Sequence, residues 1–240
     1  PEDITIVDLF GGSGLLSHTA KRTKPQAKVI YNDYDGFTGR LANIPKTNAL
    51  LSRIRSFTAD FPKKKALPES VKNKILDLIR EEEISSGYVD YITLSSPLLF
   101  SSRYATEYES LAKEKFYPNV TKNGYDATGY LEGVDVVHED YRTLYERLKD
   151  TPNVLFLVDP PYLSTDVNTY KIFWKLKDYT SILTILNGHY FVYFTSDKSG
   201  IVELCEWLGS LPGFEETFGN IAKMEVGRTL NHTSSYTDII

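Results

Sequence analysis

The tetrapeptide Asp159-Pro160-Pro161-Tyr162 follows an almost wholly apolar run and combines groups that could take part in a reaction. The Asp159 carboxylate and the Pro160 carbonyl are both hydrogen-bond acceptors, because a Pro-Pro step fixes the turn and leaves that carbonyl unpaired. Two acceptors aimed at the hydrogens of an exocyclic amine would favour pyramidal nitrogen and expose its lone pair. Tyr162 offers a flat face on which a planar ring could stack. These residues predict a site for chemistry at an amino group on a planar ring.

A second cluster lies near the N-terminus, where Asp8 and a glycine-rich turn follow the β-branched run 4–7. Glycine at 11, 12 and 14 lets the backbone turn sharply and approach a ligand closely. The spacing differs from the dinucleotide pattern Gly-x-Gly-x-x-Gly, which serves a pyrophosphate. Nearby acids instead suit a cationic ligand such as S-adenosylmethionine (AdoMet), which carries a sulfonium and an ammonium. The turn also resembles the loop that cradles AdoMet in class I methyltransferases, and this resemblance implies an AdoMet site that includes Gly11, Gly12 and Gly14.

Four carboxylates fall at or just after the ends of expected strands, namely Asp8, Asp33, Asp140 and Asp159. In an open parallel sheet, ligands bind beyond the carboxyl ends of the strands. We therefore expect the glycine turn and the tetrapeptide to open into one cavity at this edge. Asp140 could also be the N-cap of a helix that begins at Tyr141.

The elements that must position these residues alternate between strands and helices, which predicts an α/β fold with a doubly wound, mostly parallel sheet. The expected strands are 4–7, 28–32, 134–137, 153–158 and 190–195. The expected helices are 15–22, 37–54 (interrupted at Pro45), 69–83, 141–149, 172–186 and 199–208. Strands near 214–218 and 221–226 should form a C-terminal antiparallel hairpin, followed by a last strand at 234–240. Between 55 and 133 only the helix 69–83 is convincing, so an insertion interrupts the sheet.

Composition is typical of a globular protein: of 240 residues, 41% are hydrophobic and 25% charged. The single cysteine, Cys205, excludes an internal disulfide and fits an intracellular protein, and no apolar run is long enough to span a membrane. The net charge of −5 argues against a nucleic-acid ligand, but its distribution softens that objection. Residues 1–80 hold 14 Lys and Arg against 8 Asp and Glu, whereas residues 81–240 hold 13 against 24. This asymmetry permits DNA binding.

Four segments resemble, in order, the motifs of Dam-like DNA adenine-N6 methyltransferases: 10–14, 32–35, 140–141 and 159–162. The resemblance implies a class I, Rossmann-like catalytic domain formed by 1–55 and 134–240, with an inserted, mainly helical or irregular target-recognition subdomain at 56–133. Asp8 and Gly11 would hold the methionine moiety of AdoMet and Asp33 its ribose hydroxyls. Asp140 would accept a hydrogen bond from the cofactor's adenine amino group, with Phe10 and Tyr141 packing nearby.

The same resemblance implies catalytic roles for Asp159, Pro160, Pro161 and Tyr162, acting on an adenine that is flipped out of double-stranded DNA. In the insertion, basic residues alternate with aromatic ones, and Arg103 and Lys122 are candidate DNA contacts. The four histidines lack the spacing of metal ligands, so no metal is expected. We expect a bacterial or phage-encoded cytoplasmic protein. Restriction–modification with a companion nuclease, host regulation and self-protection of a mobile element all stay open as its role.

Two alternatives stay open. Aspartate in the first position of the tetrapeptide favours adenine, since serine is commoner there in cytosine-N4 enzymes and asparagine in RNA enzymes, but either of these substrates would use similar chemistry. The other alternative is a DNA-binding protein on a catalytically degenerate methyltransferase scaffold. It is motivated by the negative net charge and by the three residues before Ile4, where Dam-like enzymes carry a segment that closes over AdoMet.

Overall fold

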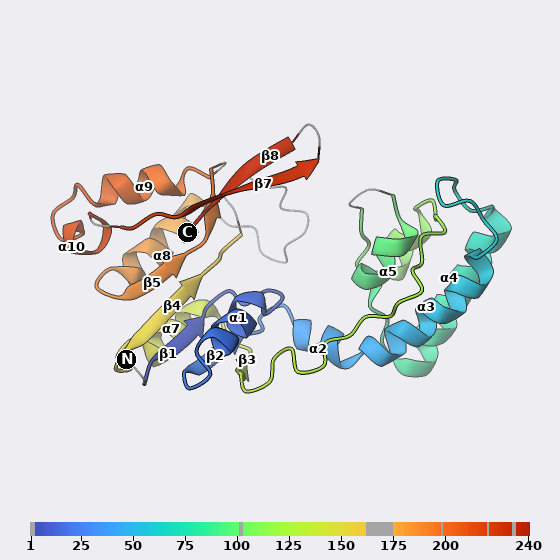
Figure 1. Cartoon of the computed structure of the whole chain (residues 1–240), viewed down its shortest axis with the longest axis horizontal. Helices are drawn as coiled ribbons and strands as arrows, with labels where there is room; N and C mark the ends of the chain where they lie inside the picture. The colour runs from blue at the N-terminus through green and yellow to red at the C-terminus, as the bar shows by residue number, and fades with distance from the viewer. Residues whose placement is uncertain (1–2, 101–102, 162–174, 198, 220, 232–233) are drawn as a thin grey trace. The chain divides into compact units, whose positions relative to one another are not determined.

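The computed structural model describes residues 3–100, 103–161, 175–197, 199–219, 221–231 and 234–240 (Figure 1). The chain divides into two compact units, and each is described by itself. The first unit consists of Pro1–Phe37 and Gly129–Ile240, and the second of Thr38–Thr128. Among the described helices, none combines the length and the apolar content that a membrane crossing needs.

The first unit is built on a five-stranded parallel sheet with the strand order β3-β2-β1-β4-β5. Its strands are β1 (Thr5–Asp8), β2 (Lys28–Asn32), β3 (Asp135–Val137), β4 (Val154–Val158) and β5 (Tyr190–Tyr193). The order reverses direction at β1, which lies between β2 and β4. The doubly wound, mostly parallel sheet predicted from the sequence is confirmed.

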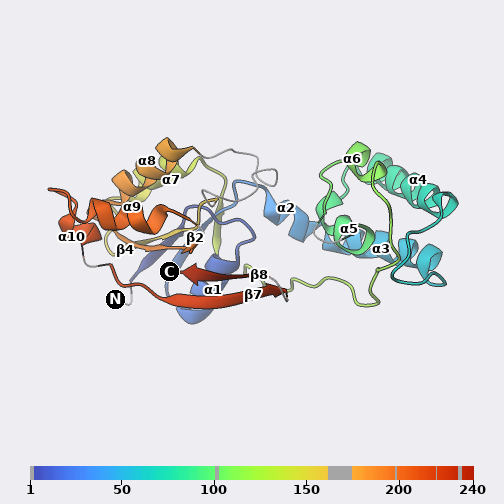
Figure 2. The same cartoon turned by 90° about the horizontal axis from the view of Figure 1, so that it is seen from above.

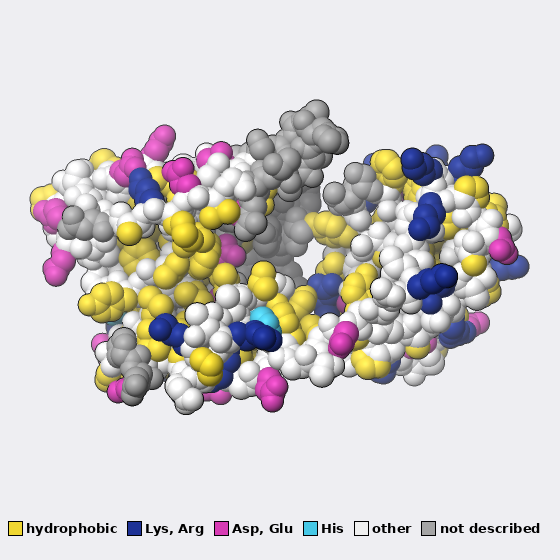
Figure 3. All heavy atoms as spheres, viewed as in Figure 1, with side chains coloured by type: hydrophobic (Ala, Val, Ile, Leu, Met, Phe, Trp, Pro, Cys, Tyr) yellow, Lys and Arg dark blue, Asp and Glu magenta, His cyan; other side chains and the backbone are white. Residues whose placement is uncertain are grey.

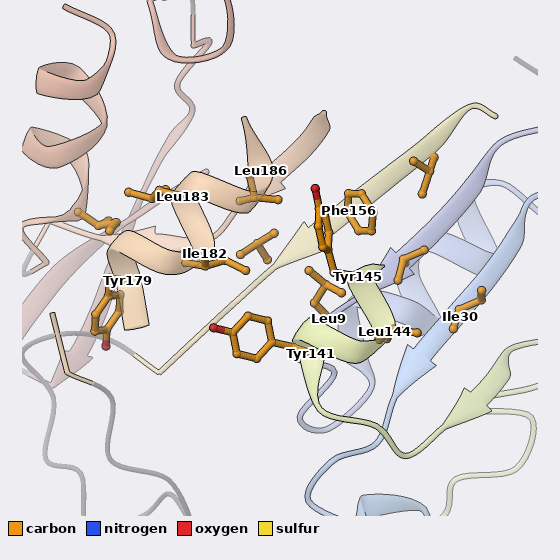
Figure 4. Packing of buried hydrophobic residues seen from close by; sticks show 14 of the residues in the cluster. Leu9, Ile30, Tyr141, Leu144, Tyr145, Phe156, Tyr179, Ile182, Leu183 and Leu186 are labelled. Atoms are coloured by element: carbon orange, nitrogen blue, oxygen red, sulfur yellow. The ribbon is translucent and has the colours of Figure 1, made fainter. Parts of the chain in front are cut away.

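Successive side chains of each strand point to opposite faces of this sheet, and apolar side chains on both faces are covered by helices. Val7 and Phe156 belong to a core that includes α7 (Tyr141–Leu148) and α8 (Leu176–Leu186), shown in Figure 4. Ile6 and Leu157 point to the opposite face. There they join a smaller cluster against which α1 (Leu15–Thr23) packs.

A three-stranded antiparallel sheet, in the order β6-β8-β7, completes the first unit. Figure 2 shows its two long strands, β7 and β8, side by side. One residue separates the end of β5 from strand β6 (Thr195–Ser196). Strand β8 (Ser234–Ile239) pairs with both β6 and β7 (Glu225–Asn231). The C-terminal hairpin is therefore present, but it is formed by β7 and β8.

The predicted strand at 214–218 is wrong. These residues form the short helix α10 (Glu215–Phe218), which comes after α9 (Ile201–Leu208). Gly213 before it has a φ of 88°, and Glu215 and Glu216 occupy the first helical turn, where acids are favoured.

The second unit is helical, with irregular segments between its helices. They are α2 (Phe37–Ala42, whose first residue belongs to the first unit), α3 (Ile44–Thr58), α4 (Glu69–Ser86), α5 (Tyr91–Leu98) and α6 (Tyr108–Ala112). Its own core contains buried residues of α3 to α6, such as Ile54, Ile79, Leu94 and Leu111. The prediction of a single convincing helix in this region missed α5 and α6.

Helix α5 begins at a specific cap: Asp90 Oδ1 accepts a hydrogen bond from the amide of Thr93 at 2.9 Å. Arg40 also reaches Asp90 Oδ2, at 3.1 Å, and so connects α2 with the start of α5. Pro97 lies in the last turn, and since a proline disfavours the interior of a helix, the sequence pattern gave no clear signal for α5.

Candidate active site

The glycine turn after β1 can be built only with glycine at its first position. A Cβ atom on Gly11 would lie 2.1 Å from the ring of Tyr31 and 2.8 Å from the carbonyl of Asn32. Gly14 has a φ of 75° and is the N-cap of α1, and its amide donates to the carbonyl of Gly11 at 2.6 Å. The turn is consequently held against the carboxyl end of β2.

Asp8 is the last residue of β1 and is fully buried. Its Oδ2 accepts a hydrogen bond from the Ser17 hydroxyl at 2.7 Å, whereas its Oδ1 meets no hydrogen-bond donor among the described residues. Burial raises the pKa of the Asp8 carboxyl to about 6, although the hydrogen bond from Ser17 opposes this rise. When the Asp8 carboxyl is ionised, its Oδ1 can accept a hydrogen bond from a positively charged group.

Asp33 follows β2 and is joined to the glycine turn through Tyr31. The Tyr31 hydroxyl lies 2.8 Å from the carbonyl oxygen of Gly12 and 3.0 Å from Oδ1 of Asp33. The amide of Phe37, at the start of α2, donates to the same Oδ1 at 2.5 Å. Burial and the charge of Asp33 hold the pKa of Tyr31 above its usual value, so the phenol stays protonated.

The tetrapeptide begins directly after β4, the strand that pairs with β1 on the side away from β2. Burial raises the pKa of the Asp159 carboxyl to about 7, with further contributions from the charges of Asp8 and of Asp238 on β8. Asp159 is partly exposed, Pro160 is buried, and the carbonyl of Pro161 accepts a hydrogen bond from the Tyr179 hydroxyl. Tyr162, the last residue of the tetrapeptide, lies outside the described residues.

Phe10 and Tyr141 are brought together, with ring centroids 4.9 Å apart and planes inclined by 43°. Asp140 precedes Tyr141 and caps α7, because its Oδ1 accepts from the amide of Arg142 at 2.9 Å. The Asp140 side chain is nevertheless exposed and could accept a further bond.

Two residues that the sequence did not single out as part of this site, Tyr130 and Leu131, lie beside the glycine turn. The ring of Tyr130 stacks on His18 with centroids 4.6 Å apart, and the carbonyl of Tyr130 accepts a hydrogen bond from Nδ1 of His18. Burial raises the pKa of the Tyr130 phenol, and the nearby Ser13 side chain opposes this rise. Leu131 follows, with a methyl carbon 3.0 Å from the position that a Cβ on Gly14 would take. The sequence placed these residues in the insertion, and no spacing signal related 130 to 13.

The two candidate DNA contacts belong to the second unit, whereas the site described above belongs to the first. Arg103 forms an ion pair with Glu114 at 2.8 Å, so its charge is partly balanced within the unit. Lys122 is exposed, and no ion pair of Lys122 is found among the described residues.

Within the first unit, the carboxyl ends of β1, β2 and β4 thus combine a glycine cradle, buried carboxylates and a proline-fixed turn. Such a site can bind a cation and can accept hydrogen bonds from an amine beside it.

The sequence comparisons agree with this chemistry. A protein of Haemophilus influenzae named "Putative methyltransferase" is 38% identical over 211 residues, which cover 86% of this chain and 70% of that protein. The family model of the D12 class N6 adenine-specific DNA methyltransferases matches residues 1–185, which include both the glycine turn and the tetrapeptide. The chain therefore belongs to the D12 class N6 adenine-specific DNA methyltransferases.

Proposed function

We propose that this chain transfers a methyl group from AdoMet to the N6 amino group of an adenine flipped out of double-stranded DNA. The observation that carries the proposal is the parallel pairing of β1 with β4, in which Asp8 lies opposite Leu157, two residues before Asp159. One carboxylate ends the strand before the glycine turn and the other opens the tetrapeptide, and they are close enough for the charge of Asp8 to raise the pKa of Asp159. A cation on the one side and an amine on the other would therefore be neighbours.

The residues present fit AdoMet. Asp8 offers a buried acceptor without a donor, which suits the ammonium of the methionine moiety, and Gly11, Gly12 and Gly14 leave room for close approach. Asp33 would face the ribose hydroxyls and Asp140 the adenine amino group, with Phe10 and Tyr141 packing beside the adenine ring. When bound, AdoMet supplies an electrophilic methyl group.

The amine would be activated by acceptors of the tetrapeptide. Asp159 and the Pro160 carbonyl would accept the two hydrogens of the adenine amino group and direct its lone pair toward the methyl group. The Tyr179 hydroxyl fixes the Pro161 carbonyl and so helps to hold the turn in place. In-line placement of nitrogen, methyl carbon and sulfur would then supply much of the rate.

The adenine must leave the duplex to reach these groups, at a cost of about a few kcal/mol. Tyr162 would stack on the flipped base, and the second unit would provide target recognition. Because DNA is the substrate, we infer an intracellular location. A companion restriction nuclease stays a prediction.

The test combines a binding and a product measurement. Calorimetry of the full chain with AdoMet should show binding, and nucleoside mass spectrometry after incubation with AdoMet and mixed-sequence DNA should detect N6-methyladenine. Asp159→Ala should abolish the product and retain AdoMet binding. N4-methylcytosine as the product would overturn the base assignment, and methylation of RNA alone would overturn the DNA assignment. A folded chain that binds DNA but not AdoMet would favour the degenerate scaffold.

A further inference from the structure

A small polar pocket lies wholly within the second unit, where α3, the end of α5 and the segment 119–125 meet. Its volume is about 90 Å³, well below the roughly 300–1,000 Å³ of pockets that hold small organic ligands. A flipped nucleotide is too large for such a pocket, but a group of the size of a phosphate can enter it.

The wall formed by 119–125 is fixed to α3 by a pair of hydrogen bonds. Asn48 Nδ2 donates to the carbonyl of Tyr125 at 2.8 Å, and Asn48 Oδ1 accepts from the amide of Tyr125 at 2.8 Å. Gly124 lies so close to Asn48 that an added Cβ would be 2.9 Å from the Asn48 amide. The pocket is thus a built feature of the fold, and its shape does not depend on a loosely attached loop.

Arg55 lines this pocket from α3 and has an unmet hydrogen-bonding requirement. Its Nε is buried and has no acceptor among the described residues. Arg53, on the same helix, is instead exposed and lies 3.7 Å from Glu81 and 3.9 Å from Glu82. A buried donor without an acceptor is unfavourable, so a ligand that brings an acceptor to Arg55 would remove that cost.

The surroundings of Arg55 favour an anion. No Asp or Glu occurs among the residues that line the pocket, whereas asparagine, serine and threonine do. Lys122 lies in the segment 119–125, between two lining residues, Thr121 and Asn123. The whole unit holds 14 Lys and Arg against 11 Asp and Glu, a balance of +3 in a chain whose net charge is −5. Lys and Arg side chains are also numerous on the face of this unit that Figure 3 shows.

We propose that this pocket binds a backbone phosphate of the DNA substrate, with Arg55 as the charged contact. The proposal rests on the proposed function in one respect, namely that DNA is the substrate. Arginine and asparagine are common phosphate ligands, and contacts of this kind position a protein on the duplex without reading its sequence. Lys122, one of the two DNA contacts expected from the sequence, would lie in the wall of the same site.

The test measures binding of the full chain to short DNA duplexes of mixed sequence, by fluorescence anisotropy, at salt concentrations from about 50 to 200 mM. For Arg55→Gln we expect an affinity loss of about tenfold that is uniform across duplex sequences. The slope of log affinity against log salt should become shallower by about 1, as the loss of one phosphate contact requires. Arg53→Gln, which removes a neighbouring charge on the same helix, should leave both quantities unchanged.

Asn123→Asp provides a second variant, because it adds a negative charge to an exposed position of the pocket wall and should not disturb folding. It should also weaken binding to all duplexes. Unchanged affinity in both variants would overturn the assignment, and so would a loss confined to particular sequences, which would indicate base recognition. AdoMet calorimetry and the methylation assay on the same samples test the proposed function separately, since Arg55 lies outside the first unit.

Discussion

Asp8 and Asp159 lie at the carboxyl ends of two adjacent parallel strands, and the negative charge of Asp8 helps to raise the pKa of the Asp159 carboxyl to about 7. The pKa of Asp8 is itself raised to about 6 by burial. Both groups must be ionised for the proposed chemistry, since one would pair with an ammonium and the other would accept amine hydrogens. The site is therefore arranged so that its two acceptors lose their protons close to neutral pH.

This coupling predicts an acid limb in the pH dependence of kcat/KM for AdoMet, which reports the ionisation of the free enzyme. The value should fall as the pH drops below about 7 and fall more steeply below about 6. Asp238→Asn removes one of the negative charges that raise the pKa of Asp159, so it should move the acid limb to lower pH. The measurement is a steady-state rate profile from pH 5 to 9, and an acid limb that does not move in Asp238→Asn would contradict it.

The raised pKa of Asp159 also has a consequence for stability. In the unfolded chain an aspartate has a pKa of about 3.9, so between about pH 4 and 7 the folded state binds more protons than the unfolded state. Stability due to this group is therefore lost as the pH rises through that window. Asp159→Asn should raise Tm at pH 8 by about 2–8 °C, the shift that about 1–2 kcal/mol produces in a chain of this size. The gain should shrink at pH 4, and Asp150→Asn, at an exposed position, should show no such pattern.

Gly11→Ala tests the glycine turn. The added Cβ would overlap the ring of Tyr31, which is buried and held by its hydrogen bonds, so the turn must shift. We expect a destabilisation of about 1–3 kcal/mol and the loss of AdoMet binding in calorimetry. Gly39→Ala is the matched control, because a Cβ at Gly39 meets no atom within 4 Å among the described residues, and alanine in a helix should stabilise the chain slightly. AdoMet binding by a stable Gly11→Ala variant would contradict the assignment of this turn.

Tyr130→Phe tests whether the segment after the second unit supports the cofactor site. The substitution removes the phenolic hydroxyl that interacts with the Ser13 side chain and retains the stacking on His18. Loss of one polar interaction of this kind, worth about 1 kcal/mol, should weaken AdoMet binding about fivefold, with little change in kcat at saturating AdoMet. Tyr190→Phe removes an exposed hydroxyl on β5 and should leave AdoMet binding unaffected. A change in Tm without a change in AdoMet affinity would show that Tyr130 only stabilises the fold.

The parts of the fold that could be predicted from the sequence are those with strong local signals. The runs that became β1 and β4 are apolar and end at polar turns, so their strands and the position of Asp159 could be inferred directly. Residues 214–218 contain two phenylalanines that indicated a strand, yet the acids between them and the flanking glycines favour the short helix α10. Here local chemistry at the termini of the element outweighed hydrophobicity.

The contacts that could not be predicted are those between residues far apart in the chain. Nothing in the sequence relates Tyr130 to Ser13, Asp238 to Asp159, or Arg55 to the segment 119–125, because each pair depends on how distant elements pack. The motif pattern indicated where a cofactor and an amine would be held. The motif pattern carried no information about the distant side chains that set the ionisation of Asp159 and the contacts of the glycine turn.

The two covalent connections between the units share a feature of practical importance. The chain leaves the first unit directly after Phe37, whose amide is bonded to Asp33, and returns at Gly129, directly before Tyr130 with its contacts to Ser13 and His18. Both hinges are thus anchored in the immediate surroundings of the glycine turn. An engineered exchange of the helical unit for that of a relative would best be joined at 38 and 128, so that the contacts of Phe37 and Tyr130 with the surroundings of the glycine turn are retained.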